Sequence, residues 1–176
     1  QAVQGRATRS LLRCDASTNE GPQWVPLECQ APLTGQDYQP GGRTALHDAI
    51  AVGIIKTGRH LHWMPEPDRP AQVIFVILTD GEENASREYS ALQVREMIGI
   101  QREKYNWTFV FLAANQDAVL VGGNLGVQQD AAITFAAKGE QTADTFAALT
   151  EATTSLRTGD TQAFAFTAEH RTRAIG

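Results

Sequence analysis

Residues 73–86 read VIFVILTDGEENAS, an unbroken apolar run followed at once by an aspartate, a glycine and two glutamates. A run of Val, Ile, Phe and Leu without alternation is typical of a central strand in a parallel sheet, which is buried on both faces. In open parallel sheets, ligands bind beyond the carboxyl ends of the strands. The stretch therefore predicts a buried strand over residues 73–79 and a polar site that begins at Asp80.

The rest of the chain alternates between strand and helix patterns, which predicts an α/β domain with a mostly parallel sheet. The spacing of Leu46, Ile50 and Ile54 predicts a helix from Thr44 to about Leu61. The other predicted strands cover 8–14, 23–29, 108–114 and 132–137, and the other predicted helices begin near 90 and 117 or span about 146–156. Pro26 makes 23–29 an edge strand, which we expect to be antiparallel. One domain is expected over residues 1–157, followed by a tail at 158–176 whose weak periodicity predicts a loose arm.

Composition limits the classes of function. The 176 residues are 42 % hydrophobic, enough for one domain with a core, and they carry a net charge of −5. An acidic balance argues against a nucleic-acid-binding surface, and every apolar stretch is far shorter than the roughly 20 residues of a membrane helix. Cys14 and Cys29 are too few for a disulfide framework and favour free thiols in a reducing compartment. We expect a cytoplasmic protein that binds neither nucleic acid nor membrane.

Asp80 has three interpretations on chemical grounds. It could cap a strand-ending turn in which Gly81 has a positive φ angle, bind a hard cation such as Mg²⁺ through its carboxylate, or act in general acid–base catalysis. Thr44 stands directly before a predicted helix and is either an N-cap or a second oxygen ligand. In the predicted topology Thr44 and Asp80 fall on the same edge of the sheet.

Other polar residues receive structural interpretations. Glu82 and Glu83 follow Asp80 in a loop before a helix, which is more typical of a solvated face than of direct metal ligands. His60 and His62 have the spacing of a metal-binding pair on a strand. They lie at the end of a predicted helix, however, where basic residues suit the helix dipole.

Two stretches resemble a known family. GGRTALHDAI at 41–50 and VIFVILTDGEENAS at 73–86 resemble the second and third motifs of the von Willebrand factor A (vWA) domain, the fold shared with integrin inserted domains. REYSALQVREMI at 87–98 and WTFVFLAANQDAV at 107–119 are similar to the stand-alone vWA proteins of bacteria and phages. The resemblance implies a three-layer, doubly wound, Rossmann-like fold.

The resemblance also implies a site and a function. The family holds a divalent cation, commonly Mg²⁺, at a metal-ion-dependent adhesion site made by an Asp-x-Ser-x-Ser motif, a threonine and an aspartate. The threonine corresponds to Thr44 and the aspartate to Asp80. A carboxylate of a protein partner completes the metal shell, so the implied function is protein binding without catalysis.

The first motif departs from the family pattern. Its one candidate is Asp15 and Ser17, with Asn19 where the last serine should be, and 44 − 15 = 29 residues separate Asp15 from Thr44. The helix, two strands and loops that the family places in this interval need more than about 35 residues. We therefore expect an N-terminally incomplete domain that lacks the first strand, the first helix and the Asp-x-Ser-x-Ser motif.

The missing strand would lie between 8–14 and 73–79, so its loss predicts open sheet edges and an exposed apolar surface. Three arrangements follow: the domain is truncated, another chain or copy supplies the strand, or 8–14 moves into its place and brings Asp15 and Ser17 to the metal site. The leading interpretation is a protein-interaction module with a partial metal site at Thr44 and Asp80. The alternatives are a Mg²⁺-dependent hydrolase that uses Asp80 with Glu82 or Glu83, and an assembly subunit that forms homo-oligomers through open sheet edges.

Overall fold

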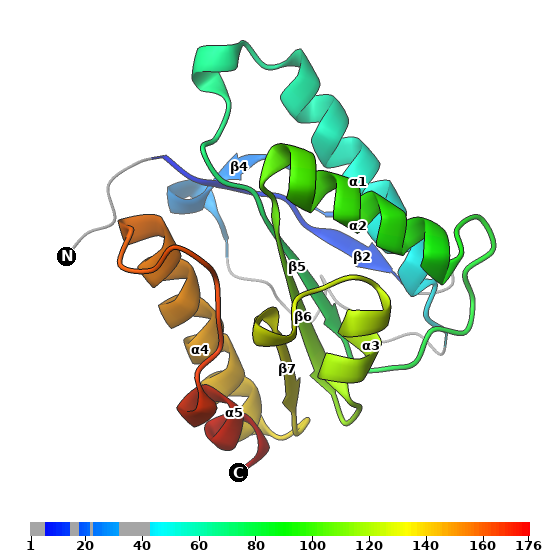
Figure 1. Cartoon of the computed structure of the whole chain (residues 1–176), viewed down its shortest axis with the longest axis vertical. Helices are drawn as coiled ribbons and strands as arrows, with labels where there is room; N and C mark the ends of the chain where they lie inside the picture. Colours follow the sequence, from blue (N-terminus) through cyan, green and yellow to red (C-terminus); the bar gives the residue numbers. More distant parts are fainter. Residues whose placement is uncertain (1–5, 15–17, 22, 32–42) are drawn as a thin grey trace. The chain divides into compact units, whose positions relative to one another are not determined.

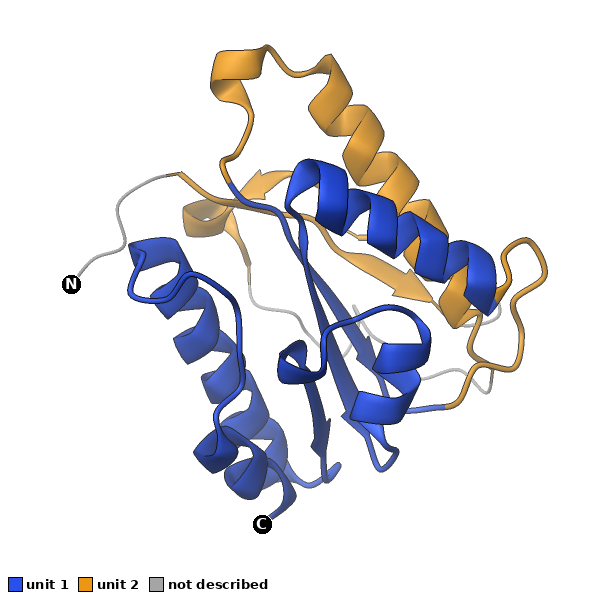
Figure 2. Cartoon of the chain, in the orientation of Figure 1, with its two compact units in different colours: residues 1–4, 72–81, 91–176 blue, residues 5–71, 82–90 orange. Residues whose placement is uncertain are grey.

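A computed structural model of the chain describes residues 6–14, 18–21, 23–31 and 43–176. The chain divides into two compact units, blue and orange in Figure 2. The first unit contains Gln72–Gly81 and Ala91–Gly176, and the second contains Gly5–Ala71 and Glu82–Ser90. The stretch that follows the strand at 73–79 thus begins in the first unit and continues into the second.

The first unit is built on a parallel sheet in the order β5-β6-β7. Its strands are β5 (Ile74–Thr79), β6 (Thr108–Ala114) and β7 (Ala132–Phe135). Ile77 of β5 lies beside Phe111 of β6, which in turn lies beside Ala132 of β7. The middle strand is buried from Phe109 to its end, so β6 forms the centre of the core. The strands predicted at 108–114 and 132–137 are confirmed.

The helices of the first unit are α2 (Ala91–Tyr105), α3 (Ala118–Asn124), α4 (Gly139–Thr158) and α5 (Ala168–Ile175). In Figure 1, α2 and α3 lie on one side of the three strands, and α4 and α5 lie on the other. α2 buries Val94 and Ile98, one helical turn apart. α3 begins where the Asp117 carboxylate accepts a hydrogen bond from Leu120 N–H at 2.9 Å. The helices predicted after Ser90, from Asp117 and over 146–156 are therefore confirmed, and the fold class is α/β.

The prediction that the 73–79 strand is central and buried on both faces is wrong. β5 lies at the edge of the three-stranded sheet, and among the described strands it pairs with β6 alone. Val76 and Leu78 are 41 % and 50 % exposed, so one face of β5 is only partly covered. An apolar run shows that a strand can be buried on both faces, whereas its actual burial depends on the layers that cover those faces, and its place in the sheet depends on neighbouring strands. The loss of a strand beside β5 stays a prediction.

The prediction of a loose arm at 158–176 is also wrong. Phe164 and Phe166 are each 5 % exposed, and Phe166 N–H donates to Asp130 O at 2.8 Å. The segment ends in α5, where Arg171 donates to the carbonyls of Ala132 and Gln129 beside β7. Two aromatic residues and one guanidinium therefore fix the tail to the sheet.

The second unit contains one long helix and short strands. The helix α1 covers Leu46–Trp63, close to the range predicted. The strands are β1 (Thr8–Arg9), β2 (Leu12–Cys14), β3 (Thr18–Glu20) and β4 (Val25–Pro26). β1 pairs with β4 and β2 with β3, both antiparallel, so each predicted strand at 8–14 and 23–29 forms only in part. Leu27–Cys29 is a 3-10 helix instead, and Cys14 and Cys29 form no disulfide, as predicted.

Among the described residues of both units, no helix combines the length and the apolar character needed to cross a bilayer.

Candidate functional site

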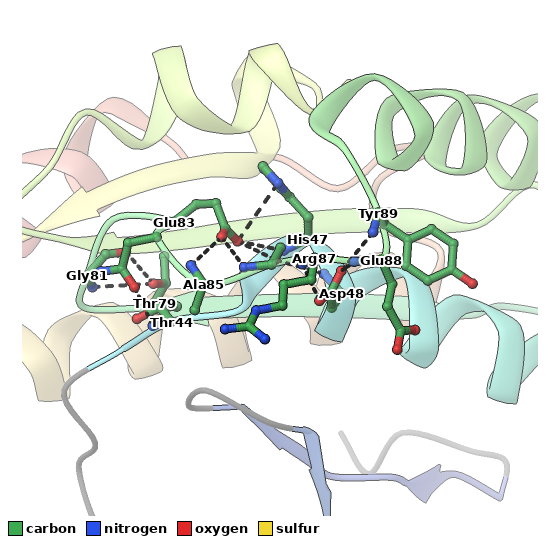
Figure 3. Close-up of polar contacts among 12 residues, drawn as sticks. Thr44, His47, Asp48, Thr79, Gly81, Glu83, Ala85, Arg87, Glu88 and Tyr89 are labelled. Atoms are coloured by element: carbon green, nitrogen blue, oxygen red, sulfur yellow. Dashed lines mark hydrogen bonds and ion pairs between the residues drawn. The ribbon is translucent and has the colours of Figure 1, made fainter.

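The start of α1 is capped by side chains that lie far away in the sequence. Its N-cap residue is Ala45, which has no side chain able to accept a hydrogen bond. Instead the Glu83 carboxylate accepts from His47 N–H at 2.9 Å, and Ser86 Oγ accepts from Asp48 N–H at 3.1 Å (Figure 3). These acceptors satisfy amide groups that a helix leaves without intrahelical partners in its first turn.

The helix caps the loop in return. The Asp48 carboxylate accepts hydrogen bonds from the amides of three successive loop residues, Arg87, Glu88 and Tyr89, at 2.8, 3.0 and 2.8 Å. Thr44 O accepts from the amides of Asn84 and Ala85, and Thr44 N–H donates to Asn84 Oδ1 at 3.0 Å. We call this set of contacts the α1–loop network. It involves Thr44, His47 and Asp48 on one side and residues 83–89 on the other, all within the second unit.

Glu83 is the most heavily hydrogen-bonded carboxylate of the α1–loop network. Besides His47 N–H, it accepts from the amides of Ala85 and Ser86 at 2.9 and 2.7 Å and from the Ser86 hydroxyl at 2.7 Å. Burial of the carboxylate raises its pKa, but the hydrogen bonds from Ser86, His47 and Ala85 outweigh this effect and lower the pKa of Glu83 to about 2. Hydrogen bonds to the ionised form stabilise that form, so Glu83 is a structural anion.

Thr44 does not cap α1, although the sequence favours that role. It lies one residue before the N-cap, and its main chain carries all of its hydrogen bonds to described residues. Its hydroxyl makes no hydrogen bond to another described residue, because Glu83 and Ser86 occupy the capping positions. The side chain of Thr44 is therefore available to a ligand.

Asp80 is likewise without a structural partner. It is exposed, and its carboxylate accepts no hydrogen bond and forms no ion pair with the described residues. Thr79 stabilises the turn instead, since its hydroxyl donates to Gly81 O at 2.8 Å and accepts from Gly81 N–H at 3.3 Å. Gln116 adds a hydrogen bond to Gly81 O at 3.2 Å. Positive φ angles among the described glycines occur at Gly126, Gly159 and Gly176, so Gly81 lacks the positive φ angle that the turn interpretation of Asp80 supposes.

The two predicted metal ligands belong to different units, Thr44 to the second and Asp80 to the first, so their pairing stays a prediction. The less favoured candidates, Asp15 and Ser17, lie outside the described residues. Within the described residues, no group of three or more His, Cys, Asp or Glu side chains is placed to hold a metal ion. A free carboxylate and a free hydroxyl have the chemistry that Mg²⁺ prefers, but as two donors they would leave most of the shell to water.

The histidine pair does not form a joint site. His60 stacks on Trp24 with ring centroids 4.0 Å apart and an interplanar angle of 3°. His62 contacts Trp63 edge-on at 5.5 Å. The two imidazoles thus pack against different aromatic rings, as expected for residues i and i+2 of a helix, which point in different directions.

Sequence reasoning missed the structural roles of Asp48, Glu83 and Ser86. Glu83 was interpreted as part of a solvated face, yet its side chain is only 21 % exposed. Two signals were present: an acidic residue in the first turn of α1, and a loop rich in the cap-forming residues Asn and Ser. Glu82 is exposed, in line with its predicted solvated position.

Comparison of the chain with protein-family models, with curated proteins and with solved structures finds no match.

Proposed function

We propose that the chain is a non-enzymatic protein-interaction module of the vWA type, in which Asp80 binds a divalent cation that a carboxylate of the partner completes. Thr44 is the second ligand, as the family resemblance implies, and Mg²⁺ is the expected ion. When bound, the cation supplies a positive charge with an open coordination position for the partner. The residues of this chain supply two of the oxygen ligands and the scaffold that holds them.

The observation that carries the proposal is that the two carboxylates Asp80 and Glu83, which follow β5, differ in their hydrogen bonding. Glu83 is fully engaged in hydrogen bonds, whereas Asp80, three residues earlier, is exposed and unpartnered at the carboxyl end of a parallel strand. The two structural roles that could explain Asp80 and Thr44, a turn and a helix cap, are filled by Thr79 and by Glu83 with Ser86. A ligand is the interpretation that best fits a carboxylate left without a partner at the carboxyl end of a parallel strand.

The low pKa of Glu83 argues against the hydrolase alternative, in which this residue could act as a base. A general base needs a pKa near the working pH, whereas the pKa of Glu83 is lowered to about 2 and its oxygens already accept four hydrogen bonds. A hydrolase would therefore depend on Asp80 and Glu82 alone.

The test is a calorimetric titration of the chain with Mg²⁺ and with Mn²⁺, repeated on D80A, T44V and the matched control E82A. Each of D80A and E82A removes one exposed carboxylate, and they lie two positions apart, so the pair separates ligation from net charge. Changes around a metal ligand commonly cost 10–100-fold in affinity, so we expect D80A to weaken binding by at least about tenfold. We expect a smaller loss for T44V and little change for E82A.

Equal binding by the wild-type chain and D80A would contradict the proposal. Equal losses in D80A and E82A would also contradict it, because they would reduce the effect to general charge. The non-enzymatic part is tested separately by turnover of generic phosphoesters in Mg²⁺, where hydrolysis that D80A abolishes would favour the hydrolase alternative.

A further inference from the structure

The outer edge of β5 has no strand partner among the described residues. Val76 and Leu78 project on the same face, because side chains alternate along a strand, and both are largely exposed. Ile77, between them, is 5 % exposed. One face of β5 therefore packs in the core of the first unit, while the other leaves two large aliphatic side chains uncovered.

The hydrogen-bond pattern shows which backbone groups point outward. Thr108 N–H donates to Val73 O at 2.9 Å, which fixes the alternation along the β5–β6 ladder. The N–H and C=O groups of Phe75 and Ile77 then point toward β6, and those of Ile74, Val76 and Leu78 point away from it. Among the described strands, none pairs with the outward-facing main-chain groups of these three residues, which lie beside exposed aliphatic side chains.

β5 also lacks the features that normally protect an edge strand. Ile74–Thr79 reads IFVILT, with no charged residue, proline or glycine in six positions. Natural edge strands are usually protected by lysines, prolines, bulges or short length. An uncharged six-residue segment of high β-propensity is the kind that pairs with another strand.

We propose that the β5 edge is a homodimer interface, in which the β5 strands of two copies pair antiparallel about a two-fold axis and make one continuous sheet. The outward-facing residues must lie opposite one another, so the axis passes through Val76 or Ile77. Val76 then faces Val76 or Leu78 of the second copy. The exposed aliphatic side chains of both copies thereby become cross-strand neighbours.

Repulsion between Asp80 carboxylates favours antiparallel over parallel pairing of the two β5 strands. In either antiparallel register, Asp80 lies opposite Gln72 or Ile74 of the second copy, far from the other Asp80. A parallel, in-register stack would instead place each Asp80 beside its copy at about the 4.8 Å strand spacing, with Glu82 close behind. In a chain of net charge −5, that repulsion disfavours open parallel stacking. The proposal does not rest on metal binding, since the strands pair through main-chain groups of β5 and the Asp80 carboxylate takes no part in that pairing.

The test combines sedimentation velocity over a micromolar concentration series with hydrogen exchange of the β5 amides. V76K and L78K each place a lysine on the open edge, and L120K is the matched control because Leu120 of α3 is 61 % exposed in the same unit. We expect a dimer for the wild-type chain and L120K. We expect V76K and L78K to weaken dimerisation by at least about tenfold, since an edge lysine blocks strand pairing. Circular dichroism verifies that each variant is folded.

Hydrogen exchange gives an independent signature in the wild-type chain. We expect the Val76 and Leu78 amides to exchange faster on dilution to monomer, while the Phe75 and Ile77 amides, bonded to β6, stay slow. A wild-type monomer at every concentration, a dimer unaffected by V76K, or larger polymers would overturn the proposal. Slow exchange of Val76 and Leu78 in a monomer would overturn it too, because a segment of the same chain would then cover the edge.

Discussion

Two carboxylates three positions apart have opposite roles in this protein. Glu83 is held by four hydrogen bonds at the start of α1, whereas Asp80 is exposed and has no partner among the described residues. Both are acidic residues in one loop, so their sequence context does not separate them. What separates them is whether amide groups lie within reach of the carboxylate, and that depends on how residues 83–89 fold onto α1.

The E83Q substitution tests the structural role of Glu83. We expect it to lower the free energy of unfolding at pH 7 by about 1–3 kcal/mol, because hydrogen bonds to a charged acceptor are replaced by weaker ones. The pKa of Glu83 falls from 4.5 to about 2 on folding, so the carboxylate stabilises the fold fully above pH 4.5. This contribution is lost as the pH falls toward 2.

Urea denaturation of wild type and E83Q between neutral and acidic pH measures this effect, with E82Q as the control. The stability difference between wild type and E83Q should shrink as the pH falls below about 4.5, and E82Q should follow wild type throughout. A difference that stays constant across this pH range would show that the glutamine acts by packing and that the ionised carboxylate is not the source.

The choice of Asp80 and Thr44 as candidate ligands comes from the sequence, and their role as ligands stays a prediction. Asp80 follows a strong strand signal and Thr44 precedes a strong helix signal. Neither side chain has a hydrogen-bond partner among the described residues. The α1–loop network was not predictable, because its hydrogen bonds join residues about 40 positions apart. Local sequence patterns predict helix caps from residues next to the helix in the sequence. The caps of α1 come instead from the distant residues Glu83 and Ser86.

At the scale of elements, α5 shows how a segment with weak periodicity can be ordered. Thr167 Oγ1 accepts from His170 N–H at 3.1 Å, and His170 Nδ1 accepts from Thr167 N–H at 3.2 Å, which makes a reciprocal capping box. His170 Nε2 lies 3.0 Å from Glu151 of α4. A helix of eight residues gives little periodic signal, so its cap and its buried aromatic anchors decide its position.

The T167A substitution removes the cap of α5. We expect it to lower the stability of the fold by about 1 kcal/mol, the usual cost of losing a threonine N-cap. T172A is the matched control, because Thr172 is an exposed threonine of the same helix whose hydroxyl bonds to Ala168 O. Thermal unfolding should show a lower midpoint for T167A than for T172A, and equal midpoints would rule out a stabilising cap.

The packing of α3 on β6 gives a test with an adjacent control. A Cβ atom at Gly122 would lie 3.2 Å from the Cβ and Cγ atoms of Phe111, whereas one at Gly123 would meet nothing within 4 Å. Alanine is the better helix former by about 1 kcal/mol, so G123A should be neutral or stabilising. G122A should destabilise the fold by about 1–3 kcal/mol through overpacking. Denaturant midpoints that rank G122A at or above G123A would contradict this packing.

On the scale of the whole molecule, the sequence predicts the α/β class and the order of the strands and helices from residue 73 to α4. Those elements have long apolar runs or regular spacing, and their predicted positions are confirmed, although α4 begins at Gly139, earlier than the sequence indicates. The last helix, α5, was not predicted. The edge position of β5 was not predictable, because an apolar run does not specify its neighbours. The segments 8–14 and 23–29 were predicted as two longer strands, whereas β1, β2 and β4 are short, since strands of two or three residues carry almost no pattern.

The vWA resemblance and the open β5 edge make separate claims about the whole molecule. One concerns a cation at the carboxyl end of the strand, and the other concerns a second copy along its side. The D80A and V76K variants test them independently, because Asp80 follows the last residue of β5 and Val76 lies outside the ligand set. We expect D80A to lose metal binding and to keep the dimer. We expect V76K to lose the dimer and to keep metal binding.

The central claim, that Asp80 and Thr44 bind a divalent cation, is tested most directly by paramagnetic broadening of amide resonances in a Mn²⁺ titration. The account predicts that the amides of Asp80, Gly81 and Thr44 broaden first in the wild-type chain, and that D80A removes this selectivity. Broadening centred on His60 and His62, or uniform broadening that D80A leaves unchanged, would contradict the account.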